Sequence, residues 1–460
     1  MNNVLLIDFG STYTKITAVD VEQEKVLGTA RGITTVETDI MDGLNEALAA
    51  LFAKTGKLEF TKVLGCSSAA GGLKMVALGL VPEMTAEAAK RAALGAGAKV
   101  LKVFTHELSE YEVEEISELK PDIILLAGGT DGGNQKVILH NARMLAELGM
   151  DIPVVVAGNK SVTPTIVKIL SEKNIEARPT ENVMPKLDEL NIEPARAAIR
   201  DIFLRRITEA KGLNRANKMV DRLVMPTPAA VLRAAELLSQ GSGKERGLGD
   251  LMVVDIGGAT TDVYSIAKGD PTVAGVVLKG LQEPFGKRTV EGDLGMRYSA
   301  GALLKAAGAE LIAEYAGVTP QEAEAYALKV EADIDHLPQN DVEAGIEIAM
   351  GKACVCLGAD RHAGNLTHYF TPMGSTFLQT GKDLTKVTTV IGTGGVIVNN
   401  PKPDEILKGI LFDESNPQVL KPKQSDFLID KEYIMSAMGL LGEEHPDVAV
   451  RMMKNYIRKK

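Results

Sequence analysis

The sequence is poor in aromatic residues and cysteines, and each shortage argues against a class of function. Tryptophan is absent and aromatic residues make up 4% of the chain, so stacking platforms for sugars or single-stranded nucleic acid are scarce. The three cysteines, Cys66, Cys354 and Cys356, do not make a disulfide framework and indicate a reducing, cytoplasmic setting. No apolar run reaches the roughly 18 residues of a membrane span, and no basic or long apolar leader precedes Val4. We therefore expect neither membrane insertion nor a signal peptide.

The charge balance argues against a nucleic-acid partner. The net charge is −10, whereas a sequence-independent nucleic-acid binder normally presents a basic face. With 45% apolar and 24% charged residues, the composition is that of an ordinary globular protein. At 460 residues the chain is longer than one hydrophobic core supports, so two or more domains are expected.

The sequence does contain one pattern that occurs twice. Each half begins with an apolar strand, a glycine-containing turn, a second strand, a turn, a third strand and a helix. In the first half the predicted strands are Val4–Phe9, Ile16–Asp20 and Lys25–Arg31, and the helix has Asp42 near its start and Gly56 just past its end. In the second half the predicted strands are Leu251–Ile256, Asp262–Ala267 and Thr272–Leu278, and the helix starts near Leu294. Residues 240–249, rich in glycine and charge, form a linker, so we predict a first lobe at 1–245 and a second lobe at 250–460.

The first half also contains a segment with a different pattern. Ile123–Leu126 and Val154–Val156 are continuous apolar runs, of the kind found in parallel strands that are covered on both faces. Helical patterns lie between and after these runs. We therefore predict an inserted α/β subdomain at about 100–180 within the first lobe.

The main candidates for chemistry lie in the turn after the first strand of each half. One turn follows Asp8 and the other follows Asp255, and each aspartate ends an apolar strand. Glycine lets the backbone approach a phosphate, turn amides point at the anion, and hydroxyl groups add donors without adding charge. An aspartate at the strand end can hold Mg²⁺ through water or orient an attacking water. The predicted phosphate-binding residues are Gly10, Ser11 and Thr12 in the first loop and Gly257, Gly258, Thr260 and Thr261 in the second.

The pairing of the two loops carries more weight than either loop alone. A single Asp-x-Gly turn after a strand is common and equally fits a tight hairpin. Two such turns, each opening a duplicated half, favour one nucleotide gripped between them. A third turn after a late strand would let the backbone lie against adenine or ribose; its residues are Gly392, Thr393, Gly394 and Gly395. No Walker A sequence is present, so we expect hairpins, and not a helix N-terminus, to bind the phosphates.

Several other residues keep two interpretations at this point. Glu291 and Asp293 either face the ligand or complement the dipole of the helix that follows them. Cys354 and Cys356 are more simply buried small apolar residues than ligands of a cluster. Cys66 lies in a glycine-rich loop, but a nucleophile there would need a histidine that the sequence does not assign.

Five stretches of the chain resemble the glutamate mutase (methylaspartate mutase) accessory protein family. This family is also called MutL-type and is unrelated to the mismatch-repair protein of similar name. The paired loops and duplicated halves also resemble the wider actin–Hsp70–sugar kinase superfamily. The stretches are VLLIDFGSTYTK at 4–15, GCSSAAGGLKM at 65–75, ILLAGGTDGGN at 124–134, VVDIGGATTDVYS at 253–265 and VEGDLGMR at 290–297.

The resemblance implies a fold, a cofactor and a partner. The fold is α/β, with two duplicated ribonuclease H-like lobes of the actin and Hsp70 type and the inserted subdomain in the first. ATP and Mg²⁺ are implied, with Asp8 and Asp255 serving the metal and water activation. Lys15 would neutralise phosphate charge, although it equally fits a lysine at a strand edge. The resemblance also implies a role beside adenosylcobalamin-dependent mutase subunits, and related reactivases use ATP to open the mutase and release damaged cobalamin.

Rival functions are compatible with the same fold. A small-molecule kinase would need a pocket for an acceptor hydroxyl, and an actin-like scaffold would assemble with ATP. An electron-transferring activator of radical dehydratases would need an iron–sulfur cluster. The leading hypothesis is a cytoplasmic ATPase that couples lobe closure to a protein partner, with a homodimer left open.

Overall fold

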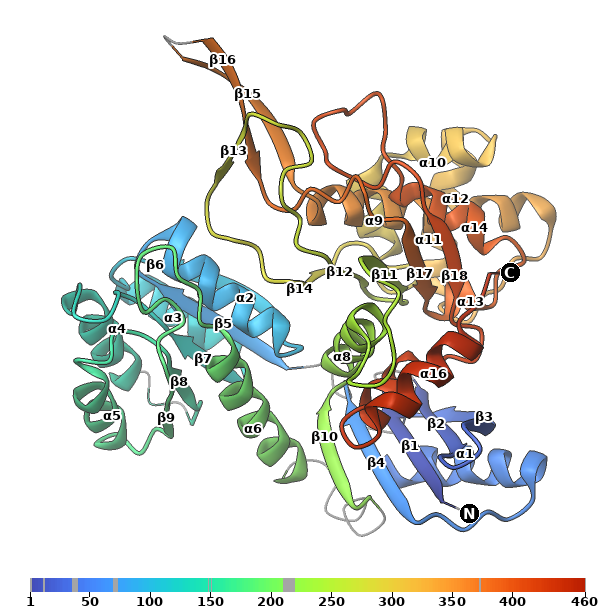
Figure 1. The fold of residues 1–460 in the computed structure, drawn as a ribbon, viewed down its shortest axis with the longest axis horizontal. Coiled ribbons are helices and arrows are strands. Elements are labelled where there is room, and N and C mark those ends of the chain that lie inside the picture. The colour runs from blue at the N-terminus through green and yellow to red at the C-terminus, as the bar shows by residue number, and fades with distance from the viewer. Residues whose placement is uncertain are drawn as a thin grey trace. The chain divides into compact units, whose positions relative to one another are not determined.

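The computed structural model describes residues 2–10, 13–34, 40–68, 73–147, 149, 151–209, 220–371 and 374–459. The chain divides into two compact units, and Figure 1 labels most of their helices and strands. Unit 1 comprises Met1–Val231, Gly280–Gln282 and Ser436–Val448. Unit 2 comprises Leu232–Lys279, Glu283–Met435 and Ala449–Lys460.

Unit 1 contains a five-stranded mixed sheet that begins at the N-terminus. Its order is β10-β4-β1-β2-β3, and the strands are Arg222–Pro226, Lys62–Ser67, Asn3–Phe9, Tyr13–Asp20 and Lys25–Ile33. β1, β2 and β3 are antiparallel, whereas β1, β4 and β10 are parallel. Helix α1 (Ile40–Thr55) packs its apolar face, including Leu44 and Leu51, against this sheet. The three predicted strands and the helix before Gly56 are confirmed.

Unit 2 contains a sheet with the same order and the same strand directions. Its order is β14-β12-β11-β17-β18, and the strands are Gly286–Glu291, Thr261–Ile266, Leu251–Ile256, Thr389–Thr393 and Asp426–Ile429. The first three strands form antiparallel pairs, and β11, β17 and β18 are parallel. The protein is therefore an α/β protein with two duplicated ribonuclease H-like sheets, as the sequence predicts.

Two predictions about the second half are wrong. The third strand of this sheet is β14 and not Thr272–Leu278, because the apolar run that ends at Leu278 supplies β13 (Val276–Lys279) to a separate sheet. The helix does not start near Leu294 but at Ala300, as α9 (Ala300–Ala307). The residues in between bond to the loop after β11 and so are not free to form a first helical turn.

The other sheet of unit 1 is entirely parallel. Its order is β6-β5-β7-β8-β9, and the strands are Lys99–Thr105, Lys74–Gly79, Ile123–Leu126, Val154–Val156 and Ala177–Pro179. Alternate residues of β7 enter two different apolar clusters, Ile123 and Leu125 on one face and Ile124 and Leu126 on the other. This double burial is the reason that the strand reads as a continuous apolar run. The helices of this part are α2 (Glu87–Gly95), α3 (Glu110–Leu119), α4 (Lys136–Glu147), α5 (Thr163–Ser171) and α6 (Glu193–Glu209), with a π-helical turn at Pro82–Ala86.

The rest of unit 2 is mainly helical. Helices α10 (Ala309–Ala316), α11 (Pro320–Ala332) and α12 (Asp341–His362) share one apolar cluster with α9, β11 and β17. A three-stranded sheet joins β13 to β16 (Gly374–Thr380) and β15 (Asn365–Thr371). No described helix is both long enough and apolar enough to cross a membrane. The other elements of unit 2 are α13 (Gly395–Val398), α14 (Pro403–Leu407) and a 3₁₀ turn at Lys408–Ile410, whereas α8 (Thr227–Gln240), α15 (Met435–Leu441) and α16 (Pro446–Tyr456) each have residues in both units.

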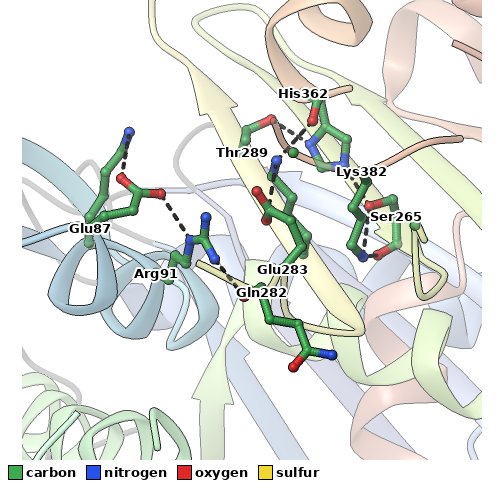
Figure 2. Close-up of polar contacts among 12 residues, drawn as sticks. Glu87, Arg91, Ser265, Gln282, Glu283, Thr289, His362 and Lys382 are labelled. Atoms are coloured by element: carbon green, nitrogen blue, oxygen red, sulfur yellow. Dashed lines mark hydrogen bonds and ion pairs between the residues drawn. The ribbon is translucent and has the colours of Figure 1, made fainter. Parts of the chain in front are cut away.

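A buried polar cluster ties the end of α12 to the sheet of unit 2 (Figure 2). The His362 ring lies 2.8 Å from Ser265 Oγ through Nε2 and 2.9 Å from Thr289 Oγ1 through Nδ1. The ammonium group of Lys382 donates to the main-chain oxygen and the hydroxyl of Ser265. Burial, together with the nearby charges of Lys287 and Lys382, holds the pKa of His362 well below its usual value.

This neutral histidine predicts a pH-dependent stability. The unfolded chain takes up a proton near pH 6.5, whereas folded His362 does not, so the free energy of unfolding falls as pH drops below about 6.5. One such proton gives a slope of about 1.4 kcal/mol per pH unit. In urea titrations at pH 7.5, 6.5 and 5.5, His362→Gln should be less stable at pH 7.5 but should lose less stability than wild type between 6.5 and 5.5. Equal slopes in both proteins would contradict this explanation.

Candidate functional site

The first predicted loop lies at the end of β1 in unit 1. Asp8 pairs with Lys15 of β2 on one side and with Cys66 of β4 on the other. Residues paired across neighbouring strands present their side chains on the same face of a sheet. The structure therefore brings Lys15 and Cys66 beside Asp8.

The turn after Asp8 needs a glycine. The amide of Gly10 donates to the carbonyl oxygens of Asp8 at 3.0 Å and Tyr13 at 3.1 Å, which closes the turn. A Cβ atom at Gly10 would lie 2.6 Å from the Tyr13 oxygen, so a larger residue would force the turn open. The predicted Ser11 and Thr12 fall outside the described residues.

Two hydroxyl groups that the sequence reasoning missed hold the carboxylate of Asp8. Thr227 Oγ1 donates to Oδ1 at 2.6 Å, and Ser436 Oγ donates to Oδ2 at 3.1 Å. Asp8 is 7% exposed, so these donors take the place of water on a largely buried carboxylate. Thr227 comes directly after strand β10, just as the predicted loops come directly after their strands. The position of a hydroxyl residue after a strand is therefore a sequence signal that points to Thr227. Ser436 lies 428 positions from Asp8 and gives no local signal.

Cys66 completes this corner of unit 1 but lacks the character of a nucleophile. Its Sγ atom lies 3.7 Å from Thr227 Oγ1, and the side chain is buried. Burial, followed by the charge of Asp8, raises the pKa of the Cys66 thiol well above its usual value. The thiolate is the reactive form of cysteine, so this environment suppresses its reactivity.

The second loop, at 257–260 in unit 2, presents its amides and uses its carbonyls for support. The amides of Gly258, Ala259 and Thr260 make no hydrogen bond within the described part of the chain. Successive unpaired amides in a turn form an anion-binding concavity. The carbonyls of Gly257, Gly258 and Ala259 accept from the Met296 amide at 3.2 Å, the Arg297 amide at 2.8 Å and the Ser299 hydroxyl at 2.8 Å.

The segment that supports this loop is itself held by a buried network. Arg297 Nη2 donates to Glu347 at 2.7 Å, and the Tyr326 hydroxyl donates to the same carboxylate at 2.5 Å. Gly295 lies so close to the loop that a Cβ atom there would be 2.5 Å from the carbonyl carbon of Ala259. These contacts fix which side of the loop faces inward, so the unpaired amides are held in place.

The third predicted turn lies beside Asp255. β17 is parallel to β11, and Thr393 pairs with Asp255. Gly394 has φ +92°, and a Cβ atom there would lie 2.4 Å from the Ile256 carbonyl oxygen and 2.7 Å from Asp255 Oδ1. Only glycine allows the turn of Gly392–Gly395 to lie this close to the aspartate. The structure thus brings the second and third predicted sets together within unit 2.

Two of the predicted polar side chains donate their hydroxyl hydrogen bonds to other groups of unit 2. The Thr261 hydroxyl is buried and donates to the Leu294 carbonyl at 2.6 Å. The Thr393 hydroxyl donates to Asp430 Oδ2 at 3.1 Å. Both hydroxyls support the backbone that carries the loops, while Gly257, Gly258 and Thr260 remain at the turn itself.

Glu291 and Asp293 share one hydrogen-bond partner, the guanidinium group of Arg361. Arg361 donates to Glu291 at 2.7 Å and to both oxygens of Asp293 at 2.7 and 2.9 Å. Hydrogen bonds from Arg361 lower the pKa of Asp293. These carboxylates pair with Arg361 within unit 2, and their interpretation as part of the first turn of a helix is wrong, because α9 starts only at Ala300.

The donors at these turns fit a polyphosphate with its magnesium ion. Unpaired amides suit phosphate oxygens, and the glycine at 394 keeps the backbone low beside Asp255. The described residues include no group of three or more His, Cys, Asp or Glu side chains able to bind a metal. Mg²⁺ commonly keeps several waters and takes oxygens from phosphates and one or two carboxylates, so an ion that arrives with a nucleotide does not need such a cluster.

Comparison with known proteins gives one family and several loose structural likenesses. The model of the family described as MutL protein matches residues 4–457. Protein MutL of Clostridium tetanomorphum is 54% identical over 461 residues, which cover 100% of both chains. Diol dehydratase-reactivating factor in nucleotide-free form is 10% identical, with a TM-score of 0.37 over 97% of this chain and 100% of that one. Ligand-bound xylulose kinase from Lactobacillus acidophilus is also 10% identical, with a TM-score of 0.36 over 100% of this chain and 93% of that one.

Proposed function

The chain belongs to the MutL protein family, and from that premise we propose that it binds and hydrolyses ATP to reactivate or chaperone an adenosylcobalamin-dependent mutase. The mutase would be of the glutamate (methylaspartate) mutase type. In this role the MutL-family chain uses ATP and Mg²⁺ as cofactors, acts on mutase subunits as partners and works in the cytoplasm.

The observation that supports ATP binding most strongly is the equivalence of Asp8 and Asp255. Each is the second-last residue of the central strand of its sheet, just before a glycine turn and beside the next parallel strand. A duplicated arrangement with an acidic residue at the same place in both copies suits one ligand that needs both. We assign to Asp8 and Asp255 the contact with the metal and the orientation of the attacking water.

The remaining residues are assigned by the donors they present. Gly258 and Thr260 present amides that are unpaired among the described residues and would donate to phosphate oxygens. Gly10 and Gly257, whose amides close their own turns, would let the backbone approach the phosphates, with Ser11 and Thr12 added from the first loop. Lys15, beside Asp8, would offset phosphate charge. Gly392, Thr393, Gly394 and Gly395 would lie against the adenosine, and Thr261 would support the second loop from within. When bound, Mg²⁺ neutralises phosphate charge and polarises the γ-phosphoryl group.

The proposal predicts ATP-dependent recovery of a damaged mutase. The mutase that co-purifies with this chain from its native source is inactivated with a cobalamin that lacks the adenosyl group. Addition of the chain with ATP and Mg²⁺ should release that cobalamin, measured by filtration and absorbance, and fresh adenosylcobalamin should then restore activity. Asp255→Ala, used as the matched control, should release little.

Different outcomes would point to different functions. If ATP-dependent release does not exceed release with no nucleotide, the reactivating role is wrong. Transfer of the γ-phosphate to a small molecule would instead favour a kinase of the same fold. ATP-dependent sedimentation of the chain alone would favour a scaffold.

A further inference from the structure

Two side-chain hydroxyl groups donate hydrogen bonds to the buried carboxylate of Asp8. Each oxygen of this buried carboxylate accepts one side-chain hydroxyl, Thr227 at 2.6 Å on Oδ1 and Ser436 at 3.1 Å on Oδ2. Hydrogen bonds from a hydroxyl to a carboxylate are charge-assisted and are stronger than neutral ones. With both oxygens bonded, rotation of the carboxylate about χ2 breaks at least one bond.

The two hydroxyls reach Asp8 because two helices cross at very close range within unit 1. A Cβ atom at Gly439 of α15 would lie 1.9 Å from the carbonyl oxygen of Ala230 in α8, so only glycine permits this approach. Thr227 precedes Ala230 by three residues, and Ser436 precedes Gly439 by three. Positions i and i+3 lie on the same side of a helix. The crossing therefore places both hydroxyls together, one turn away, where β1 ends.

The equivalent place in unit 2 is built differently. There, the residue after β18 is Asp430, which accepts from the amides of Ile434 at 2.8 Å and Met435 at 3.1 Å and from the Thr393 hydroxyl. That carboxylate accepts the amides at the N-terminus of α15 and bonds to Thr393, the residue that pairs with Asp255.

We propose that Thr227 and Ser436 are positioning residues that hold the Asp8 carboxylate in its working orientation for ATP hydrolysis. This inference rests on the proposed function, because it needs Asp8 to act on the nucleotide. Thr227 and Ser436 act through Asp8 and do not touch the reacting atoms. A misdirected carboxylate lowers the rate of the chemical step more than it weakens nucleotide binding.

The kinetic test uses variants that remove the hydroxyl and keep the shape. Thr227→Val should lower kcat for ATP by about 10-fold or more while the KM for ATP changes by less than about 3-fold. Ser436→Ala should have the same direction with a smaller effect, since its bond to Asp8 is longer. Thr227→Ser keeps the hydroxyl and should restore most of kcat. Addition of Thr227→Val to Asp8→Ala should cause no further loss.

A second readout needs neither nucleotide nor activity. Urea unfolding of Thr227→Val, Asp8→Asn and the double variant, all without ATP, measures the coupling of the two side chains. For a direct bond, the unfolding constant of the double variant should differ from the product of the single effects by at least about 5-fold. Additive effects would show that Thr227 does not hold Asp8 and would overturn the inference.

The outcomes separate this inference from the function on which it rests. If Thr227→Val and Ser436→Ala keep wild-type kcat while Asp8→Ala is inactive, the positioning role is wrong and the ATPase proposal stands. A fall in kcat that Thr227→Ser does not reverse would also overturn it, since a structural role would explain that loss. If wild type itself does not hydrolyse ATP with or without its mutase, the proposed function fails and takes the positioning role with it.

Discussion

Asp255→Ala should lower ATP turnover by at least about 10²-fold, and Asp8→Ala should do the same. Each aspartate is the second-last residue of the central strand of its sheet, just before a glycine turn, and each pairs with the neighbouring parallel strand. In the role that we propose for the two aspartates, removal of either carboxylate would remove a ligand for the metal or a group that orients water. The measurement is release of phosphate from ATP under saturating nucleotide and Mg²⁺.

A matched control separates chemistry from a general loss of acidic charge. Asp250 is exposed and lies just before β11, so Asp250→Ala removes the same side chain five positions from Asp255. This variant should keep wild-type turnover. Unfolding midpoints within a few degrees of wild type would show that the inactive variants are folded. Wild-type turnover in both Asp8→Ala and Asp255→Ala would refute the roles given to them.

Gly394→Ala should abolish nucleotide binding and destabilise unit 2. The residue has φ +92°, and the added Cβ would meet the Ile256 carbonyl oxygen at 2.4 Å and Asp255 Oδ1 at 2.7 Å. These atoms belong to a buried strand and to the side chain assigned to the metal, so the turn must move away from β11. Overpacking of this kind costs roughly 1–3 kcal/mol, in addition to the cost of a positive φ. Binding is measured by calorimetry and stability by urea unfolding.

Gly317→Ala is the control for the backbone part of this effect. Gly317 also has a positive φ, +69°, but a Cβ atom there would meet nothing within 4 Å. This variant should lose about 1 kcal/mol of stability and bind nucleotide as wild type does. If Gly394→Ala behaves like Gly317→Ala, the close contact with Asp255 has no role in binding.

The sequence predicts the elements of each sheet that follow simple periodic rules. β1 and β11 are buried apolar runs, the helix before Gly56 has a regular apolar face, and β7 and β8 are covered on both faces. Strand β14 of the second half does not follow such a periodic rule. β14 has the sequence GKRTVE, in which Arg288 is buried because it forms an ion pair with Asp262 at 2.7 Å. An apolar pattern cannot reveal a strand whose burial depends on an ion pair.

The sequence predicts only part of the candidate site, because some of its contacts are local in the chain and others are not. The glycines and aspartates of the turns are local signals, and they identify Asp8, Asp255 and Gly394 from sequence alone. The groups that hold them are not local. Ser436 contacts Asp8 although the two residues are 428 positions apart in the sequence. Arg297 supports the second loop through its main-chain amide, which a side-chain pattern does not reveal.

Calorimetric titration of the chain with ATP and Mg²⁺ tests the shared use of the two loops most directly. If both loops serve one nucleotide, wild type binds one ATP per chain, and Gly10→Ala and Gly394→Ala each remove that binding completely. If instead wild type binds two ATP per chain and each variant loses one, the loops are separate sites. A chain that binds no ATP, or variants that bind as wild type does, would contradict the assignment of a nucleotide to these turns.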